Sequence, residues 1–240
     1  SPGYRNIKLK YLRSFFNWCV QEGYLPANPT LGIKKSKEDN ENVRHVKLEE
    51  IKKLLQQIDK KSYTGSVSYT QIDTGGRPGE LLQVLPSDIS LDSREIRIRP
   101  EVSKTRIART LVLSPYTAQA LAKFLRFRPS WWGENVPVFA SENGKILSTS
   151  WWSKRLAKYS RLAGVKITPY SLRHTFAIEF LRNGGDLFSL QRILGHLDIT
   201  TTKRYIHLSQ NDIKEIHLKA SPVQKLQETN KRAPRNIKES

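Results

Sequence analysis

The sequence has few of the residues that build disulfides, metal clusters or membrane spans. Its 240 residues include one cysteine, Cys19, which excludes an internal disulfide and a cysteine-based metal cluster and fits a reducing compartment. No apolar run approaches the roughly 18 to 20 residues of a membrane-spanning helix. The start, Ser1-Pro2-Gly3, has neither an initiator methionine nor an apolar signal region. We therefore expect a soluble chain that begins inside a longer protein.

Acidic residues are also scarce. The chain has 22 Asp and Glu against 41 Lys and Arg, which gives a net charge of +19 and a pI near 10.1. Because 38% of the residues are hydrophobic and 9% are aromatic, the chain has enough apolar material for a folded core. A folded protein of this charge fits a polyanionic partner, and nucleic acid is the leading candidate.

The pattern divides the chain into a short N-terminal part and a larger C-terminal part. Apolar residues recur at helical spacing from Leu9 to Val20, and Gly23 supplies a stop. Residues 34–42 (KKSKEDNEN) are polar or charged throughout, which is typical of a linker. We expect a helical module over residues 1–33, a linker over 34–45, a large domain over 46–218 and a basic tail over 219–240.

The large domain is predicted to be mainly α-helical with a small antiparallel β-sheet, an α+β fold. Alternating β-branched residues predict a hairpin of two strands, 95–99 and 107–113, with Lys104 near its bend. Gly75-Gly76 breaks the chain before Pro78, so Arg77 is expected at a helix N-terminus. Asp186 is a good N-cap. Helical periodicity is found over residues 48–58, 80–85, 115–127, 150–163, 171–182, 187–194 and about 201–206.

Five motifs follow one another in this domain. They are T-G-G-R-P-G-E-L-L around Arg77, the hairpin Lys104, T-P-Y-S-L-R-H-T-F-A over 168–177, L-G-H over 194–196 and T-T-K-R-Y-I-H-L-S over 201–209. Each alone is compatible with an ordinary helix start or a solvated charge. In this order, from residue 46 to about 216, the sequence resembles the tyrosine recombinases, the phage integrase family. The N-terminal F-F-N-W-C-V-Q-E-G-Y-L-P-A-N-P looks like the last helical part of that family's core-binding domain.

The resemblance implies a site-specific DNA recombinase or integrase that cleaves and rejoins strands through a 3′-phosphotyrosine. Two guanidinium groups, Arg77 and Arg173, suit the non-bridging phosphate oxygens because they donate paired hydrogen bonds. Lys104 is the candidate general acid for the leaving 5′ oxygen. His196 can hydrogen-bond a phosphoryl oxygen, and Tyr205 is the expected nucleophile.

One position departs from the family pattern. Tyr170 stands where the first motif histidine is expected, and a phenol with a reference pKa of about 10 is a poor base at neutral pH. We expect Tyr170 to donate a hydrogen bond to the phosphoryl group or to position Arg173, which leaves the acceptor of the Tyr205 proton unassigned. Gly76 replaces a usual apolar residue and could loosen the placement of Arg77. We interpret His174 as a packing residue.

The resemblance also implies partners and excludes cofactors. The partner is double-stranded DNA, held in a clamp by two domains, with self-association into a tetramer through the segment Asn211 to Leu218 and possible DNA-bending accessory proteins. The expected location is the cytoplasm, at the nucleoid. No cofactor or metal is expected, because a phosphotyrosine keeps the bond energy and the sequence has neither a Walker-type loop nor a carboxylate cluster of the two-metal kind.

Other functions stay open at this point. Tyr170 and Gly76 favour a recombinase-fold protein that has lost catalysis and acts as a DNA-binding protein or repressor. A type IB topoisomerase shares the chemistry, although the segment Asn211 to Leu218 argues against it. A helix-turn-helix over 187–206 would leave Arg77, Lys104 and Arg173 unexplained.

Overall fold

The chain divides into two units, Ser1–Val43 and Arg44–Ser240, in a computed structural model. The structure describes residues 2–37, 46–59 and 62–206, together with 217, 221–223 and 226. Most of the predicted linker and tail lies outside these residues, as does the predicted docking segment Asn211 to Leu218 except His217, so the predicted domain limits stay predictions. Among the described residues, no helix combines the length and apolar character that crossing a bilayer requires.

The N-terminal unit is one long helix with a returning segment. Helix α1 (Pro2–Gln21) starts earlier than the apolar pattern predicts, because Pro2 fits the first helical turn. The segment after it is tied back by Asn28, which is 7% exposed and donates to the carbonyl oxygen of Arg13 at 3.2 Å and to Asn17 Oδ1 at 2.6 Å. Side-chain amides thus hold the returning segment along the helix.

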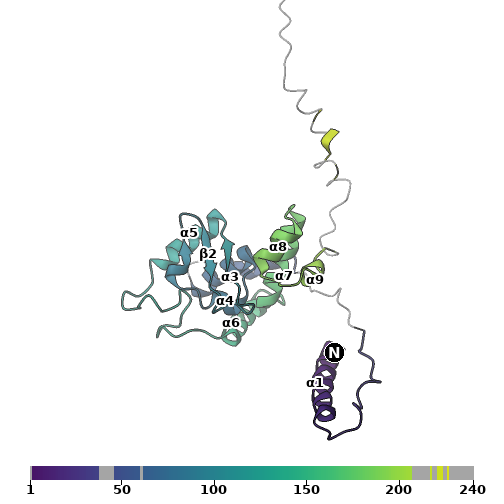
Figure 1. Ribbon diagram of the computed structural model, residues 1–240. Coiled ribbons are helices and arrows are strands. Elements are labelled where there is room, and N and C mark those ends of the chain that lie inside the picture. The colour runs from purple at the N-terminus through teal and green to yellow at the C-terminus, as the bar shows by residue number, and fades with distance from the viewer. Residues whose placement is uncertain are drawn as a thin grey trace, which may run out of the picture. The chain divides into compact units, whose positions relative to one another are not determined.

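The larger unit is mainly helical with one small antiparallel sheet, as predicted (Figure 1). Its elements are α2 (Leu48–Gln56), α3 (Tyr63–Thr74), α4 (Pro78–Leu81), the 3₁₀ turn η1 (Pro86–Asp88), β1 (Ile89–Ser90), β2 (Glu95–Ile98), β3 (Arg109–Val112), α5 (Pro115–Leu125), α6 (Thr149–Leu162), α7 (Pro169–Arg182), α8 (Leu187–Leu194) and α9 (Thr200–Lys203). Arg77 is the N-cap of α4, so its predicted place at a helix N-terminus is confirmed. Helix α4 ends at Leu81, earlier than the predicted 80–85, because the 3₁₀ turn at Pro86 follows.

Side-chain caps decide where five of these helices begin. The cap accepts a hydrogen bond from a backbone amide of the first turn, which would otherwise have no partner. The capping residues are Ser62 for α3, Ser114 for α5, Ser148 for α6, Thr168 for α7 and Asp186 for α8. The prediction of Asp186 as an N-cap is confirmed. Short polar residues thus set the starts of the helices that carry the site.

Helix α3 lies between α5 and α7 and contacts both, although the sequence pattern does not predict it (Figure 1). The buried residues of α3 are mostly small, and they lie on nearly all sides of the helix rather than on one apolar face. Gln71 in its interior accepts a hydrogen bond from Trp152 Nε1 at 2.9 Å and donates to the carbonyl oxygen of Pro169 at 2.8 Å. A helix wrapped by its neighbours needs no amphipathic stripe, so periodicity does not reveal it.

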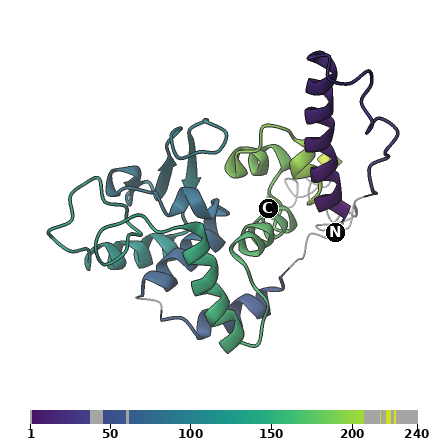
Figure 2. The same cartoon turned by 90° about the horizontal axis from the view of Figure 1, so that it is seen from below.

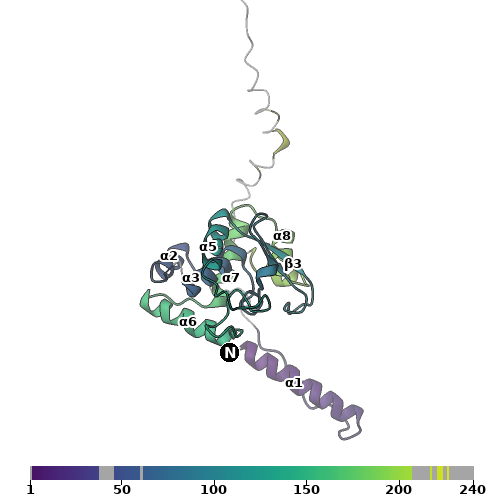
Figure 3. The same ribbon diagram turned by 90° about the vertical axis from the view of Figure 1, so that its left-hand side faces the viewer.

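The sheet has the order β1-β2-β3 and pairs Ile96 with Leu111 and Ile98 with Arg109. Ile96, Ile98 and Leu111 are fully buried, and Arg109 shares their face because it lies two residues before Leu111. Helix α8 packs beside β3 (Figure 2). Helices α2 and α6 lie at the other side of the unit (Figure 3). The sheet therefore brings one charged side chain to the inner face next to α8.

Candidate active site

Three arginines from three elements meet at the C-terminal end of α8. The pairs are Arg109 Nε with the carbonyl oxygen of Ile193 at 2.8 Å, Arg173 Nη2 with that of Leu194 at 2.7 Å and Arg77 Nη2 with that of Gly195 at 2.9 Å. The last carbonyls of a helix lack partners within the helix and carry partial negative charge. Three cations are therefore held close together by the end of one helix.

A buried carboxylate offsets part of this positive charge. Glu80, whose side chain is 3% exposed, accepts two hydrogen bonds from Arg109, at 3.1 and 2.5 Å, and one from Arg77 Nη1 at 3.0 Å. Burial alone would raise the pKa of Glu80. The hydrogen bonds and charge of Arg109, followed by the charge of Arg77, hold it below its ordinary value. Glu80 is thus an ionised side chain that fixes both guanidinium planes.

Glycines border the arginine cluster, and one of them, Gly195, makes room for Arg109. Gly195 has a φ of +62°, and a Cβ there would lie 3.1 Å from three side-chain atoms of Arg109. Gly75 also has a φ of +62°, and its carbonyl oxygen accepts a hydrogen bond from Arg173 Nη1 at 2.8 Å. At Gly76 a Cβ would lie 2.8 Å from Leu81, so the core fills the space that a side chain would take. The glycine does not loosen Arg77, whose guanidinium is held by Glu80 and Gly195.

Arg173 is linked to His196 in a partly buried chain of hydrogen bonds. Burial and then the charge of Arg77 lower the pKa of Arg173 to about 9, so the guanidinium is charged at neutral pH. Its Nη2 lies 3.1 Å from His196 Nε2, and His196 Nδ1 lies 2.9 Å from Thr202 Oγ1. Because a guanidinium only donates, Nε2 accepts and Nδ1 carries the hydrogen. Burial and neighbouring arginines lower the pKa of His196 to about 3, which agrees with this neutral form.

Tyr205 is buried and paired with His174. Tyr205 is 2% exposed, and its hydroxyl oxygen lies 2.7 Å from His174 Nδ1. Burial raises the pKa of Tyr205, although the charges of Arg173 and Arg204 oppose this. Burial, followed by the same two arginines, lowers the pKa of His174 to about 4. Both partners are therefore neutral at neutral pH, and His174 has a more specific contact than a packing residue needs.

The two remaining predicted site residues face solvent. Lys104 is exposed in the connection between β2 and β3, and Tyr170 is 60% exposed in the first turn of α7. Neither side chain hydrogen-bonds to another residue in the part of the chain that the structure describes. The structure thus joins Arg77, Arg173 and His196 at the end of α8, joins Tyr205 to a histidine outside the predicted set, and leaves Lys104 and Tyr170 apart.

The sequence reasoning missed Arg109 and Glu80. A signal for Arg109 was present, because it occupies an inward position of the alternating stretch before Leu111, where an apolar residue is expected. A charged side chain at such a position requires a buried partner of opposite charge. Glu80 is that partner, and both residues support the arginines of the predicted site.

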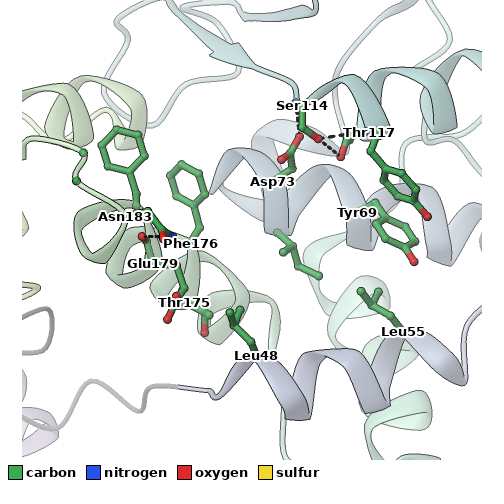
Figure 4. A pocket seen from close by; sticks show the side chains of 15 residues that line it. Leu48, Leu55, Tyr69, Asp73, Ser114, Thr117, Thr175, Phe176, Glu179 and Asn183 are labelled. Atoms are coloured by element: carbon green, nitrogen blue, oxygen red, sulfur yellow. Dashed lines mark hydrogen bonds between the residues drawn. The ribbon is translucent and has the colours of Figure 1, made fainter. Parts of the chain in front are cut away.

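Of two grooves on the described part of this unit, one includes site residues. The first is lined by apolar side chains of α2, α3 and α7, such as Leu48, Leu55 and Phe176 (Figure 4), and contains none of the predicted site residues. The second runs between α8 and the stretch before β3, and its wall includes Arg109 and His196. The second groove therefore gives access to the cluster of charged residues.

Comparisons with known proteins match most of this chain. The Phage integrase family matches residues 44–212. Tyrosine recombinase XerC of Yersinia pestis is 30% identical over 222 residues, which cover 90% of this chain and 72% of the relative. Tyrosine recombinase XerD of Listeria innocua is 31% identical over 222 residues, which cover 88% of this chain and 73% of the relative.

Solved structures share the fold. The crystal structure of XerA recombinase is 31% identical with a TM-score of 0.63 and covers 75% of this chain, which spans 65% of the XerA chain. A lambda integrase fragment, crystallised as a dimer bound to a COC′ core site, has a TM-score of 0.68 at 21% identity, over 83% of this chain and 74% of its own. With the family match extending across every residue of the cluster, the chain belongs to the phage integrase family, the tyrosine recombinases.

Proposed function

We propose that this protein cuts and rejoins duplex DNA at specific sites, with Tyr205 as the nucleophile that forms a 3′-phosphotyrosine. The observation that carries the proposal is the cluster at the end of α8, where Arg77, Arg173 and His196 are joined by hydrogen bonds. Tyr205 follows α9, which contacts α8, so one short stretch of chain links the nucleophile to the cluster.

The arginines would bind the scissile phosphate. In the structure their Nη groups donate to neutral carbonyl oxygens, and an anionic phosphate oxygen is a stronger acceptor. Glu80 holds Arg77 in orientation during this exchange. Charge that develops on the phosphorus oxygens is then stabilised by fixed cations in a partly buried site.

Two further groups would complete the site. His196 can donate to a phosphoryl oxygen once Nε2 carries a hydrogen, and the negative charge of the phosphate favours that form. Lys104 would protonate the leaving 5′ oxygen, because it stands exposed on the connection that borders the groove with His196. Tyr170, exposed at the start of α7, would donate a hydrogen bond to the DNA.

Partners are proposed from the charge and from the relatives. Lambda integrase has been crystallised as a dimer bound to a COC′ core site and as a tetramer bound to a Holliday junction. We extend DNA binding and multimer formation to this chain, with the segment Asn211 to Leu218 as the predicted contact between subunits. Accessory DNA-bending proteins and a cytoplasmic, nucleoid-bound location belong to the same proposal. The repressor and the topoisomerase are not favoured, because the relatives are recombinases.

The test is formation of a covalent adduct on a nicked suicide substrate, followed on a denaturing gel. Tyr205→Phe should abolish the adduct, because only the attacking hydroxyl is removed. DNA affinity should be nearly unchanged, and the lost hydrogen bond to His174 should lower the unfolding free energy by about 1 kcal/mol. An undiminished adduct in Tyr205→Phe would reject Tyr205 as the nucleophile and make Tyr170 the next candidate.

A further inference from the structure

The sequence does not supply an acceptor for the Tyr205 proton, and the structure offers one. Tyr170, which stands where the resemblance expects a histidine, is 60% exposed. The imidazole of another residue contacts the proposed nucleophile, since His174 Nδ1 lies 2.7 Å from the Tyr205 hydroxyl. Among the described residues this is the only hydrogen bond of that hydroxyl. The contact joins a proton acceptor directly to the reacting oxygen.

We propose that His174 is the general base of strand cleavage, and this rests on the proposed function because it needs Tyr205 as the nucleophile. As Tyr205 Oη bonds to phosphorus, the bond from phosphorus to the 5′ oxygen breaks. The Oη proton passes to His174 Nδ1, and the leaving 5′ oxygen takes a proton from Lys104. On rejoining, the 5′ hydroxyl attacks phosphorus and gives its proton back to the Lys104 amine. The bond from phosphorus to Tyr205 Oη breaks, and the imidazolium of His174 returns its proton to Oη.

The charge state of the pair suits this role. Burial and the neighbouring arginines lower the pKa of His174 to about 4, so the ring is neutral at neutral pH and keeps a free lone pair. An imidazole lone pair is a better acceptor than a phenol oxygen, so the hydroxyl of Tyr205 donates to Nδ1. The hydroxyl proton becomes strongly acidic as Oη bonds to phosphorus, and a weak base is then sufficient to accept it.

The position of His174 is set by its neighbour in α7. Arg173 is held by the carbonyl oxygens of Gly75 and Leu194, at 2.8 and 2.7 Å, which fixes this turn of the helix. His174 follows directly, and its ring centroid is 5.8 Å from that of Tyr205. One turn of α7 therefore presents a phosphate-binding group and a proton acceptor at the same time.

The first test compares the whole chain with His174→Asn and His174→Ala in single-turnover adduct formation on the nicked substrate. The asparagine oxygen takes the place of Nδ1 and accepts the hydrogen bond, but it does not take up a proton at neutral pH. Both variants should be slower by about 100-fold or more, with unchanged DNA affinity. A His174→Asn rate equal to wild type would make His174 a positioning residue, and a faster rate would make it a restraint on Tyr205. Either result would overturn the proposal.

A second substrate, with sulfur in place of the bridging 5′ oxygen, separates the base from the acid. A thiolate leaves without protonation, so Lys104→Ala should cleave this substrate nearly as fast as wild type. The His174→Asn defect should persist, because the attacking oxygen must still lose its proton. Recovery of His174→Asn on sulfur would assign His174 to the leaving group and overturn the proposal. A wild type that forms no adduct on either substrate would refute the proposed function itself.

Discussion

Glu80 shows how a single carboxylate organises a group of cations. It is buried between Arg77 and Arg109, and its removal would leave three guanidinium groups near one another without a counter-charge. Breaking a buried ion pair from one side is far more costly than losing a surface pair. The placement of the site arginines thus depends on Glu80, which the sequence predicted only as part of a helix.

We expect Glu80→Gln to lower the unfolding free energy at pH 7 by about 3 kcal/mol, measured by urea unfolding. The control is Glu179→Gln, whose partner Arg182 has a side chain that is 39% exposed. The control should lose less than about 1 kcal/mol. Equal losses in the two variants would contradict the assignment of Glu80.

The same variant predicts a pH dependence. Because the folded-state pKa of Glu80 lies below its reference value of 4.5, its contribution is present above that value. The contribution is lost as the pH falls toward the folded-state pKa. The stability difference between wild type and Glu80→Gln should therefore shrink below about pH 4.5. A difference that stays constant down to pH 3 would be inconsistent with an ionised, paired Glu80.

The charged groups of the proposed site also predict the effect of removing metal ions. Guanidinium and ammonium groups are proposed to neutralise the phosphate, which is the role that Mg²⁺ has in two-metal nucleases. Adduct formation should persist in EDTA at a rate close to that in buffer. Complete loss in EDTA, restored by Mg²⁺, would reject the proposed mechanism.

Among the helices and strands, the end of α8 connects the helix directly to the site. Gly195 ends the helix in the left-handed region with a φ of +62°, and its carbonyl oxygen binds Arg77. A side chain there meets two obstacles, the backbone conformation and the side chain of Arg109. The left-handed backbone conformation is common to other helix ends, whereas the contact with Arg109 is specific to this one.

A matched pair of variants separates the two obstacles. Gly164 follows α6 with a φ of +64°, and nothing lies within 4 Å of a Cβ built there. Gly164→Ala should lower the unfolding free energy by about 1 kcal/mol from the backbone alone. Gly195→Ala should cost more and should slow adduct formation, because Arg109 must move. Equal stability losses with unchanged cleavage would show that the contact with Arg109 is unimportant.

Elements differ in how far the sequence predicts them. The start of α8 could be predicted, because Asp186 is a recognisable cap. Periodicity predicted the helix over 171–182, but not that its cap at Thr168 makes α7 begin at Pro169. Helix α3 was missed because Gly65, Ser66 and Ser68 make a helix that is buried by close packing rather than by an apolar stripe. The contact of His174 with Tyr205 could not be predicted for a related reason, since the two residues are 31 positions apart.

For the whole molecule, the net charge of +19 predicts the form of DNA binding. Lysines and arginines that neutralise phosphates release counterions, so log K should fall linearly with log salt, by about 0.9 per phosphate neutralised. Filter binding from low to moderate salt would measure the slope. A nearly flat dependence would contradict the interpretation of the charge as a DNA-binding surface.

The arginine cap on α8 has an evolutionary consequence. Arg77 and Arg173 serve the fold as well as the site, because they donate hydrogen bonds to the carbonyl oxygens at the end of α8. A descendant that no longer cuts DNA would still need them in order to fold. Lys104 is exposed and has no hydrogen bond to any described residue, so it does not stabilise the fold in this way. Loss of the lysine would therefore mark a retired enzyme, whereas intact arginines would not prove an active one.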